Sequence, residues 1–259
     1  VRAEYPRIKE QIERSLKKST GDIMYNTGEL ADSLSLDRVT GAGKAFVPFF
    51  AQMKNGYVLL LTKSANVGHL LRLPHAGHTI MAWSVNAPLV SKTFELGAPS
   101  FDERIEAAQR AQKAGYRIRI RLDPIIPLKG WKGLYKKTVR EIFRRIEPER
   151  VTLGTLRFEP AFCGMRETIL SPGSELKDYM NDLQPMFTRD EDGRVGKLSF
   201  PKQDRIKMFA WMMGEIRRYS DCPIAVCKEE PDVWKALGLD VSDCRCVCQL
   251  DSADCRSTV

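Results

Sequence analysis

The sequence lacks any uninterrupted apolar run of membrane-spanning length, and its first residues show no export signal. These two absences argue against a membrane-spanning helix and favour a cytoplasmic protein without a membrane partner. The composition is ordinary for a soluble globular protein, with 43% hydrophobic and 29% charged residues among 259. A chain of this length has room for one large or two small domains with a sizeable core.

The chain is poor in acidic residues relative to basic ones. It has 33 Asp and Glu against 41 Lys and Arg, which gives a formal net charge of +8. A basic surface helps a protein to hold a polyanion such as DNA. Because many basic proteins bind no nucleic acid, the charge by itself only makes DNA a candidate partner.

Cysteine is absent before Cys163, and no two cysteines form a CxxC pair. In a chain without an export signal, cysteines are reduced thiols or metal ligands rather than disulfides. Cys244, Cys246 and Cys248 alternate with other residues, so on a strand all three thiols would share one face. They are the candidate ligands of zinc or of a second iron-sulfur cluster. The alternative is a reduced, Cys-rich tail. Further thiols that would complete a site are Cys222, Cys227 and Cys255.

Apolar runs of strand length alternate with stretches of helix length over the first 162 residues. The predicted strands are 23–25, 57–62, 79–83, 116–122 and 151–158, and the predicted helices are 2–18, 46–53, 67–73, 101–114 and 135–146. A repeated βα unit is typical of an α/β fold with a parallel sheet or partial barrel. Beyond Phe162 the rhythm fades, apart from a helix over 204–219 and a candidate last strand over 223–227. We therefore divide the chain into a barrel part, 1–162, and a helical, Cys-rich extension, 163–259.

Polar residues follow the predicted strands at their carboxyl ends, which is where ligands bind in parallel α/β proteins. The first strand breaks at Asn26-Thr27-Gly28. The polar residues after the first three strands are Glu29, Asp32, Ser33, Asp37, Lys63, Ser84 and Asn86. We interpret them as candidate ligand contacts. The alternative for the first stretch is an ordinary turn in which Asp32 or Ser33 caps a helix.

The strand over 116–122 carries Arg117, Arg119 and Arg121 on one side. One interpretation is a solvated or salt-bridged strand face. The other is an inner barrel wall, on which cations need anionic partners and on which Arg121 or Asp123 contacts a ligand.

The histidines His69, His75 and His78 lie close together in sequence, but their spacing is not that of a helical metal pair. We expect them to have capping or packing roles.

Several short motifs follow one another in order over about residues 20–160. They are Leu61-Thr62-Lys63, His69-Leu70-Leu71, Trp83-Ser84-Val85-Asn86, Phe94-Glu95-Leu96-Gly97, Arg104-Ile105-Glu106-Ala107-Ala108, Lys113-Ala114-Gly115-Tyr116, Asp123-Pro124-Ile125 and Gly130-Trp131. Together they resemble the spore photoproduct lyase family of the radical S-adenosylmethionine (SAM) superfamily. Cys227-Lys228-Glu229 with Val233-Trp234 resembles lyase-related proteins more weakly.

This resemblance implies a partial parallel (β/α) barrel with a 4Fe-4S cluster, which reduces SAM to methionine and a 5′-deoxyadenosyl radical. The radical abstracts hydrogen from a substrate, which for the lyase is a thymine dimer in DNA. It therefore implies repair of thymine lesions, and a reductant such as flavodoxin or ferredoxin as a partner.

The resemblance also implies which residues hold SAM. Gly28-Glu29 matches the Gly-Gly-Glu element that binds the SAM amino group, with Thr27 in place of the first Gly. Lys63 and Ser84 match lyase residues that contact SAM. A cation, a carboxylate and a hydroxyl complement the carboxylate, ammonium and ribose hydroxyls of SAM. The predicted SAM-binding residues are Gly28, Glu29, Lys63, Ser84, Asn86 and Arg121.

Two departures from the family pattern change the expectation. The C-x3-C-x2-C loop that binds the cluster is absent, and it should lie upstream of the strand that begins near residue 22. Because the chain starts at Val1 without Met, we expect that an N-terminal part is missing and that this chain alone is inactive. Glu29 stands where the lyase has a Cys that returns a hydrogen atom to the product radical. That substitution favours a relative with another substrate.

The rival hypothesis is a non-catalytic, degenerate barrel that acts as a nucleic-acid-binding module. Such a module would bind DNA with steep salt dependence and would never cleave SAM.

Overall fold

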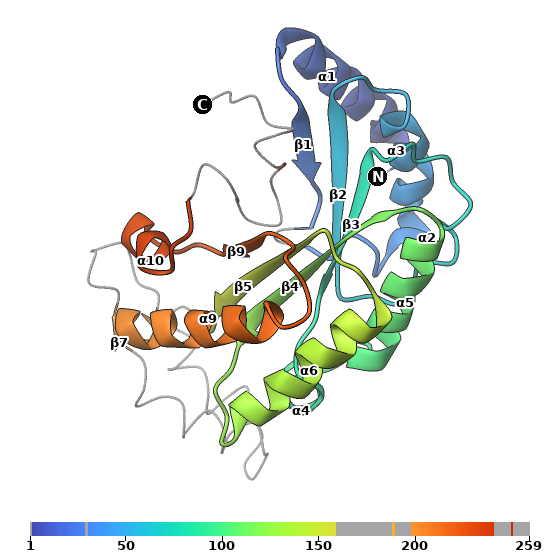
Figure 1. The fold of residues 1–259 in the computed structure, drawn as a ribbon. Coiled ribbons are helices and arrows are strands. Elements are labelled where there is room, and N and C mark those ends of the chain that lie inside the picture. The colour runs from blue at the N-terminus through green and yellow to red at the C-terminus, as the bar shows by residue number, and fades with distance from the viewer. Residues whose placement is uncertain (1, 29–30, 159–187, 190–197, 241–249, 251–259) are drawn as a thin grey trace.

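The computed structural model describes residues 2–28, 31–158, 188–189, 198–240 and 250. Six parallel strands form one curled sheet in the order β1-β2-β3-β4-β5-β9 (Figure 1). The strands are β1 Ile23–Asn26, β2 Gly56–Thr62, β3 Thr79–Ser84, β4 Arg117–Ile125, β5 Arg150–Thr155 and β9 Ile224–Val226. The predicted α/β fold with a partial parallel barrel is confirmed, and so is the last strand expected over 223–227.

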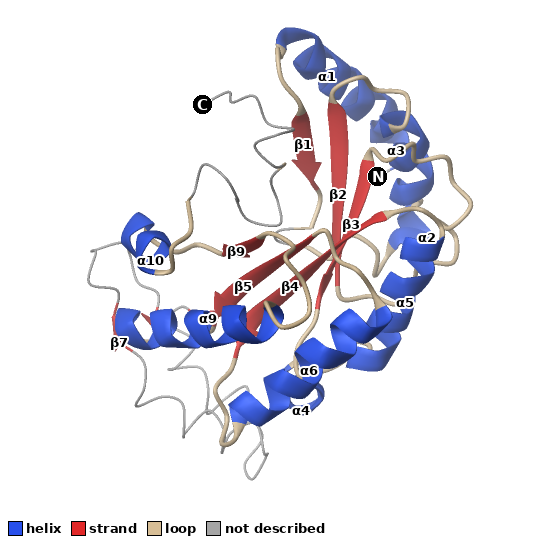
Figure 2. Cartoon of the chain, viewed as in Figure 1, coloured by secondary structure: helices blue, strands red, loops and turns tan. Residues whose placement is uncertain are grey.

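Helices follow the curl of the sheet on one side (Figure 2). They are α1 Tyr5–Lys18, α2 Asp37–Thr40, α3 Ala42–Phe50, α4 Pro88–Phe94, α5 Phe101–Lys113, α6 Trp131–Arg145, α9 Lys202–Ile216 and α10 Pro231–Ala236, with a 3-10 helix η1 at Arg2–Glu4. Among the described residues, none of these helices combines the length and the apolarity that crossing a membrane requires.

Strand β2 shows why the sheet strands are continuous apolar runs. Val58 and Leu60 pack into the main core with the helices, whereas Leu59 and Leu61 join a second cluster on the other face. Both faces of β2 are therefore covered, and such a strand has no alternation of polar residues. The prediction for 57–62 agrees with β2 to within one residue for the same reason.

Helix α5 begins and ends where its sequence predicts. The Ser100 hydroxyl accepts a hydrogen bond from the Glu103 N–H at 3.3 Å, and the Glu103 carboxylate accepts one from the Ser100 N–H at 2.7 Å. This reciprocal capping box satisfies two N–H groups that a helix terminus leaves open. After the helix, Gly115 adopts a φ of 89°, which glycine tolerates better than any other residue.

The helix predicted over 67–73 is wrong. This stretch forms turns in which Leu70 N–H donates to Val67 O at 2.9 Å and Leu73 N–H donates to Leu70 O at 2.9 Å. Gly68 and Pro74 leave too little uninterrupted chain for a stable helix. Conversely, α4 was not predicted, because a seven-residue helix shows little periodicity.

Part of the chain after β5 forms a small antiparallel sheet in the order β6-β8-β7. Its strands are β6 Arg157–Phe158, β7 Thr188–Arg189 and β8 Leu198–Ser199. From the same C-terminal part, α9 packs against α6, and β9 pairs with β5 in the main sheet. The division into 1–162 and 163–259 stays a prediction, although β9 connects the second part to the sheet of the first.

Candidate functional site

A cavity of about 350 Å³ opens at the carboxyl ends of strands β1 to β4. Its volume lies in the range of ligand pockets, which is roughly 300–1,000 Å³. The lining residues are Gly28, Ala31, Asp32, Leu61, Thr62, Lys63, Ser84, Arg121 and Asp123. Four of the six predicted SAM-binding residues are among them. We call this the strand-end cavity.

Gly28 lies where the loop after β1 passes very close to β2. The Asn26 Oδ1 atom accepts a hydrogen bond from the Gly28 N–H at 3.0 Å, which fixes the turn. A Cβ atom at this position would lie 2.7 Å from both Leu61 Cβ and Ser33 Oγ. Only glycine allows this approach without displacing its neighbours.

The Asp32 carboxylate connects this loop to the end of β2. Its Oδ1 accepts hydrogen bonds from the Leu34 and Ser35 N–H groups and from the Thr62 hydroxyl at 2.7 to 2.9 Å. Its Oδ2 accepts the Lys63 N–H at 2.6 Å. The expected capping of backbone N–H groups at Asp32 is present, but it closes a turn, and α2 begins only at Asp37.

Lys63 extends from the end of β2 to a buried carboxylate. Its Nζ lies 3.0 Å from Glu95 Oε1, and the Lys63 side chain is 37% exposed, against 5% for Glu95. Burial raises the pKa of the Glu95 carboxyl, but the charges of Lys63 and Arg104 outweigh that effect and lower the pKa below its ordinary value. The ammonium of Lys63 is thereby held beside the strand-end cavity.

Arg104 on α5 joins Glu95 to the end of β3. Its Nη1 lies 2.6 Å from Glu95 Oε2 and donates to the Ser84 carbonyl oxygen at 3.0 Å. The Nε atom donates to Pro99 O at 2.7 Å, and Nη2 donates to Ser91 Oγ at 3.0 Å. Sequence reasoning assigned no role to Glu95 or Arg104. Both residues do lie in short motifs in which the chain resembles the spore photoproduct lyase family, Phe94–Gly97 and Arg104–Ala108, and these motifs could have indicated a role.

Arg121 and Asp123 close the far side of the cavity. Arg121 Nε and Nη2 both donate to Asp123 Oδ2, at 2.9 and 2.5 Å, and the Ser84 hydroxyl donates to the Asp123 carbonyl oxygen at 3.3 Å. Opposite, a Cβ at Gly154 would lie 2.5 Å from Asp123 Oδ1. The absent side chain of Gly154 therefore leaves the space in which the Asp123 carboxylate sits.

The other two arginines of β4 form ion pairs away from the cavity. Arg117 Nε lies 2.6 Å and Arg119 Nε 2.5 Å from the carboxylate of Glu149. The interpretation that this strand face is salt-bridged is thus confirmed for both, and Arg121, which lines the cavity, is also ion-paired, to Asp123.

Asn86 is 1% exposed and is not among the residues that line the cavity. Its amide nitrogen donates to Pro124 O at 2.7 Å, and its Oδ1 accepts from the Tyr135 hydroxyl at 2.6 Å and from the Ala87 N–H at 3.0 Å. Its predicted contact with SAM stays a prediction. In this structure the side chain supports the β3 end.

The expected packing roles of two histidines are confirmed. The His75 ring stacks on Tyr116 and the His78 ring stacks on Tyr57. His69 instead pairs with a buried aspartate, with Nε2 2.5 Å from Asp37 Oδ2.

Glu29, Cys244, Cys246 and Cys248 lie outside the described residues. Within the part of the chain that is described, no cluster of His, Cys, Asp and Glu has the arrangement of a metal site. The metal site predicted at the three cysteines stays a prediction.

The strand-end cavity thus offers one ammonium group, one guanidinium group, two carboxylates and two hydroxyls at adjacent strand ends. Such a set suits a zwitterionic ligand with hydroxyl groups, because each charge of the ligand meets a group of opposite sign.

Comparison with known proteins places this geometry in a family. The family model described as spore photoproduct lyase matches residues 7–162. The chain is 24% identical over 213 residues to the spore photoproduct lyase of Clostridium acetobutylicum, a match that covers 79% of this chain and 60% of the relative. It is 34% identical over 129 residues to the enzyme of Geobacillus sp., covering 50% of this chain and 37% of the relative. It is 31% identical over 141 residues to the enzyme of Bacillus subtilis, a match that covers 54% of this chain and 40% of the relative.

Solved structures agree in fold. A spore photoproduct lyase complexed with dinucleoside spore photoproduct superposes with a TM-score of 0.72 at 21% identity, covering 86% of this chain and 67% of that one. A lyase variant with bound AdoMet and dinucleoside spore photoproduct superposes with a TM-score of 0.72 at 21% identity. This match covers 85% of this chain and 66% of that one.

The matches thus extend over much of this chain but over only 37% to 60% of the length of these curated relatives. The family model covers more than half of the 259 residues, in one continuous stretch that includes β1 to β5. The chain therefore belongs to the spore photoproduct lyase family.

Proposed function

We propose that this chain forms the SAM-binding part of a radical SAM enzyme of the spore photoproduct lyase type. The observation that carries the proposal is the strand-end cavity. Gly28, Lys63 and Ser84 come from three separate sequence motifs, yet they line one space of about 350 Å³. Family membership supports the same assignment, as does the AdoMet bound in one solved relative.

The charged and polar residues of the cavity support SAM as the ligand. Lys63 supplies a positive charge for the SAM carboxylate, and the Ser84 hydroxyl supplies a hydrogen-bonding group for the ribose. Gly28 lets the loop after β1 pack tightly against β2 at the cavity, because a Cβ atom there would meet Leu61 and Ser33. Arg121 and Glu29 complete the proposed set. SAM, when it is bound and reduced, supplies the radical that abstracts hydrogen from the substrate.

The 4Fe-4S cluster belongs to the activity of the whole protein, and its ligands are expected upstream of β1. Translating the gene in frame upstream of codon 1 tests that expectation. An open frame that encodes C-x3-C-x2-C supports the radical enzyme. An in-frame stop immediately upstream contradicts it and favours the nucleic-acid-binding module.

For the substrate we propose a thymine lesion or a related lesion in DNA, with flavodoxin or ferredoxin as reductant. The formal net charge of +8 and the dinucleoside photoproduct bound in a solved relative support DNA as the partner. A lesion must leave the base stack to reach a radical at the strand ends. Preference for damaged or unstacked DNA over intact duplex is therefore expected.

The test of the SAM site is a binding titration with the full-length gene product. Lys63→Ala removes a charge-assisted hydrogen bond, and we expect it to weaken SAM binding by about tenfold to a hundredfold. Ser84→Ala removes a hydrogen bond between uncharged groups and should weaken SAM binding by about threefold to tenfold. Lys136→Ala, on an exposed position of α6, is the control. Unchanged SAM affinity in both site variants would contradict the assignment of Lys63 and Ser84 to the SAM site.

A further inference from the structure

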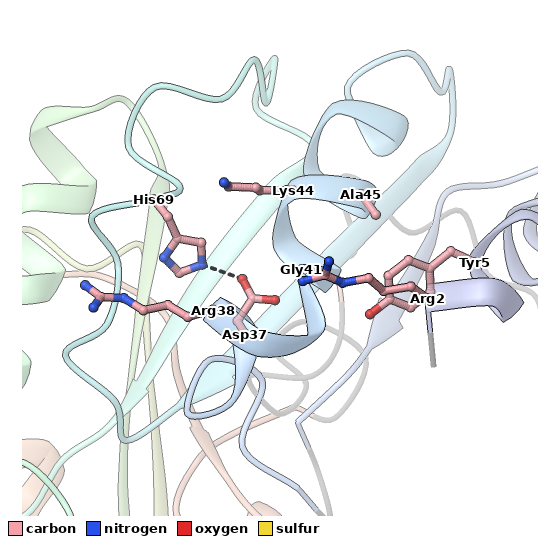
Figure 3. A pocket seen from close by; sticks show the side chains of 8 residues that line it. All are labelled: Arg2, Tyr5, Asp37, Arg38, Gly41, Lys44, Ala45 and His69. Carbon is pink, nitrogen blue, oxygen red and sulfur yellow. Dashed lines mark hydrogen bonds and ion pairs between the residues drawn. The ribbon is translucent and has the colours of Figure 1, made fainter.

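A second and larger cavity, of about 720 Å³, lies among α1, α2, α3 and the turns after β2. Its lining residues, drawn in Figure 3, are Arg2, Tyr5, Asp37, Arg38, Gly41, Lys44, Ala45 and His69. None of them lines the strand-end cavity. The connection between β1 and α3 contributes to both, with Ala31 and Asp32 on the first and Asp37 and Arg38 on the second. We call the second space the basic cavity.

The carboxylate in the basic cavity is already engaged within the protein. Asp37 is 1% exposed, its Oδ2 lies 2.5 Å from His69 Nε2, and its Oδ1 accepts the Gly43 N–H at 2.8 Å. A Cβ at Gly43 would lie 2.5 Å from Asp37 Oδ2, so glycine is what lets α3 begin beside this carboxylate. The Asp37 carboxylate is therefore buried beneath the cavity and bonded within the protein.

Cationic side chains from three elements line the same cavity. Arg2 of η1 donates from Nε to Thr40 O at 2.9 Å and from Nη2 to Val39 O at 2.5 Å, which fixes its guanidinium at one rim. Arg38 of α2 and Lys44 of α3 are exposed, and Figure 3 shows their side chains extending on the same side as His69. Within the described part of the chain, neither Arg38 nor Lys44 has an ion-pair partner. Three cationic side chains thus line a cavity whose one carboxylate is already bonded within the protein.

We infer that the basic cavity is a binding site for a phosphate group. Guanidinium and ammonium groups are the side chains that recognise phosphate, and here three of them line one cavity. The volume suits a phosphorylated small molecule or a segment of nucleic-acid backbone. The shared chemistry is the phosphate oxyanion. This site goes beyond the proposed SAM function, because it uses none of the SAM-binding residues.

The test compares charge-reversed pairs of exposed residues. Arg38→Glu/Lys44→Glu removes both unpaired cations without disturbing a hydrogen bond of the fold. Lys136→Glu/Lys137→Glu makes the same change in net charge at exposed positions of α6 and is the matched control. Wild type and both variants are titrated with inorganic phosphate at constant ionic strength, and separately with a short single-stranded oligonucleotide. Circular dichroism and melting curves verify that all three proteins are folded.

We expect the cavity variant to bind phosphate at least about tenfold more weakly than wild type, with the control within about twofold. Loss of phosphate binding alone identifies a small phosphorylated ligand, whereas loss of oligonucleotide binding identifies the nucleic-acid backbone. If wild type binds neither ligand, or if the cavity variant matches the control with both, the inference is overturned. Neither outcome depends on SAM binding, so failure here is distinct from failure of the proposed function.

Discussion

The Arg104 guanidinium and the Glu95 carboxylate form a buried ion pair, with Nη1 2.6 Å from Oε2, behind the strand ends that carry Lys63 and Ser84. Glu95 holds the Lys63 ammonium, and Arg104 holds the Ser84 carbonyl oxygen. Two proposed SAM contacts on neighbouring strands thus depend on one pair of charges. Glu95 directly follows α4 and Arg104 lies on α5, so the segment that connects β3 to β4 positions the cavity as directly as the strands do.

Arg104→Met should destabilise the fold by about 3 kcal/mol, because it leaves the buried Glu95 carboxylate with the Lys63 ammonium and the Ser91 hydroxyl and removes the bond to Ser84. Chemical denaturation measures this change, and SAM titration should show weaker binding as well. Arg110→Met, at an exposed position of the same helix, is the control and should stay within about 0.5 kcal/mol. Equal effects of the two substitutions would contradict the role assigned to Arg104.

Glu95→Gln should change how stability depends on pH. The pKa of Glu95 is lower in the folded chain than its ordinary value of 4.5, despite the opposing effect of burial, because Lys63 and Arg104 favour the charged form. Its contribution is therefore fully present above about pH 4.5 and is lost as the pH falls through the lowered pKa. The difference in unfolding free energy between wild type and variant should be largest near neutral pH and shrink below pH 4.5. A difference that stays constant between about pH 6 and pH 3 would contradict this.

Gly28→Ala should destabilise the protein by about 1–3 kcal/mol, since the new methyl group would overlap Leu61 and Ser33. It should also weaken SAM binding, because the loop that carries the proposed contacts has to move. The control is Gly133→Ala on α6, where a Cβ meets no atom within 4 Å. That substitution should stabilise the helix by about 0.5–1 kcal/mol. The same Gly→Ala change is thus expected to lower the free energy of unfolding at position 28 and to raise it at position 133. Thermal or denaturant unfolding measures both changes.

The positions of the strand ends were predictable from the sequence, but the side chains that hold the residues at those ends were not. Lys63 and Ser84 follow continuous apolar runs, and the carboxyl ends of parallel strands meet at one edge of a sheet. The ion-pair partner of Lys63, in contrast, is Glu95, which directly follows α4, and no periodic pattern in the sequence links these two residues. Asp32 illustrates the same limit. Capping of a helix by Asp32 or Ser33 was one of two interpretations of the sequence, whereas the bonds of Asp32 to Thr62 and Lys63 require the next strand to be in place.

The basic cavity was beyond sequence reasoning for a similar reason. Asp37 and His69 are 32 residues apart, and they meet because β2 and its following turns return the chain beside α2. The predicted helix over 67–73 would have placed His69 on a helical surface. In the structure, turns at Val67 and Leu70 bring its ring to the buried carboxylate.

Asn86 and Tyr135 provide a final prediction, because their contact distinguishes a supporting role of Asn86 from direct binding of SAM. The Tyr135 hydroxyl donates to Asn86 Oδ1 at 2.6 Å and accepts the Ile126 N–H at 2.9 Å, and burial raises the pKa of this hydroxyl. Tyr135→Phe leaves the buried Ile126 N–H without this acceptor and leaves Asn86 Oδ1 with the Ala87 N–H alone, which should cost about 1–3 kcal/mol of folding free energy. Tyr219→Phe, at a partly exposed ring, is the control and should be nearly neutral.

A double-mutant cycle between Tyr135→Phe and Asn86→Ala measures how far these two side chains act as a unit. If Asn86 supports the β3 end through Tyr135, the cycle should show a coupling energy of about 1 kcal/mol or more in stability. SAM affinity should then fall to a similar extent in both single variants, because both disturb the same strand end. A direct SAM contact predicts a different pattern, in which Asn86→Ala weakens SAM binding while Tyr135→Phe leaves it unchanged. Since the amide of Asn86 is bonded at both ends by Pro124, Ala87 and Tyr135, we expect the first pattern.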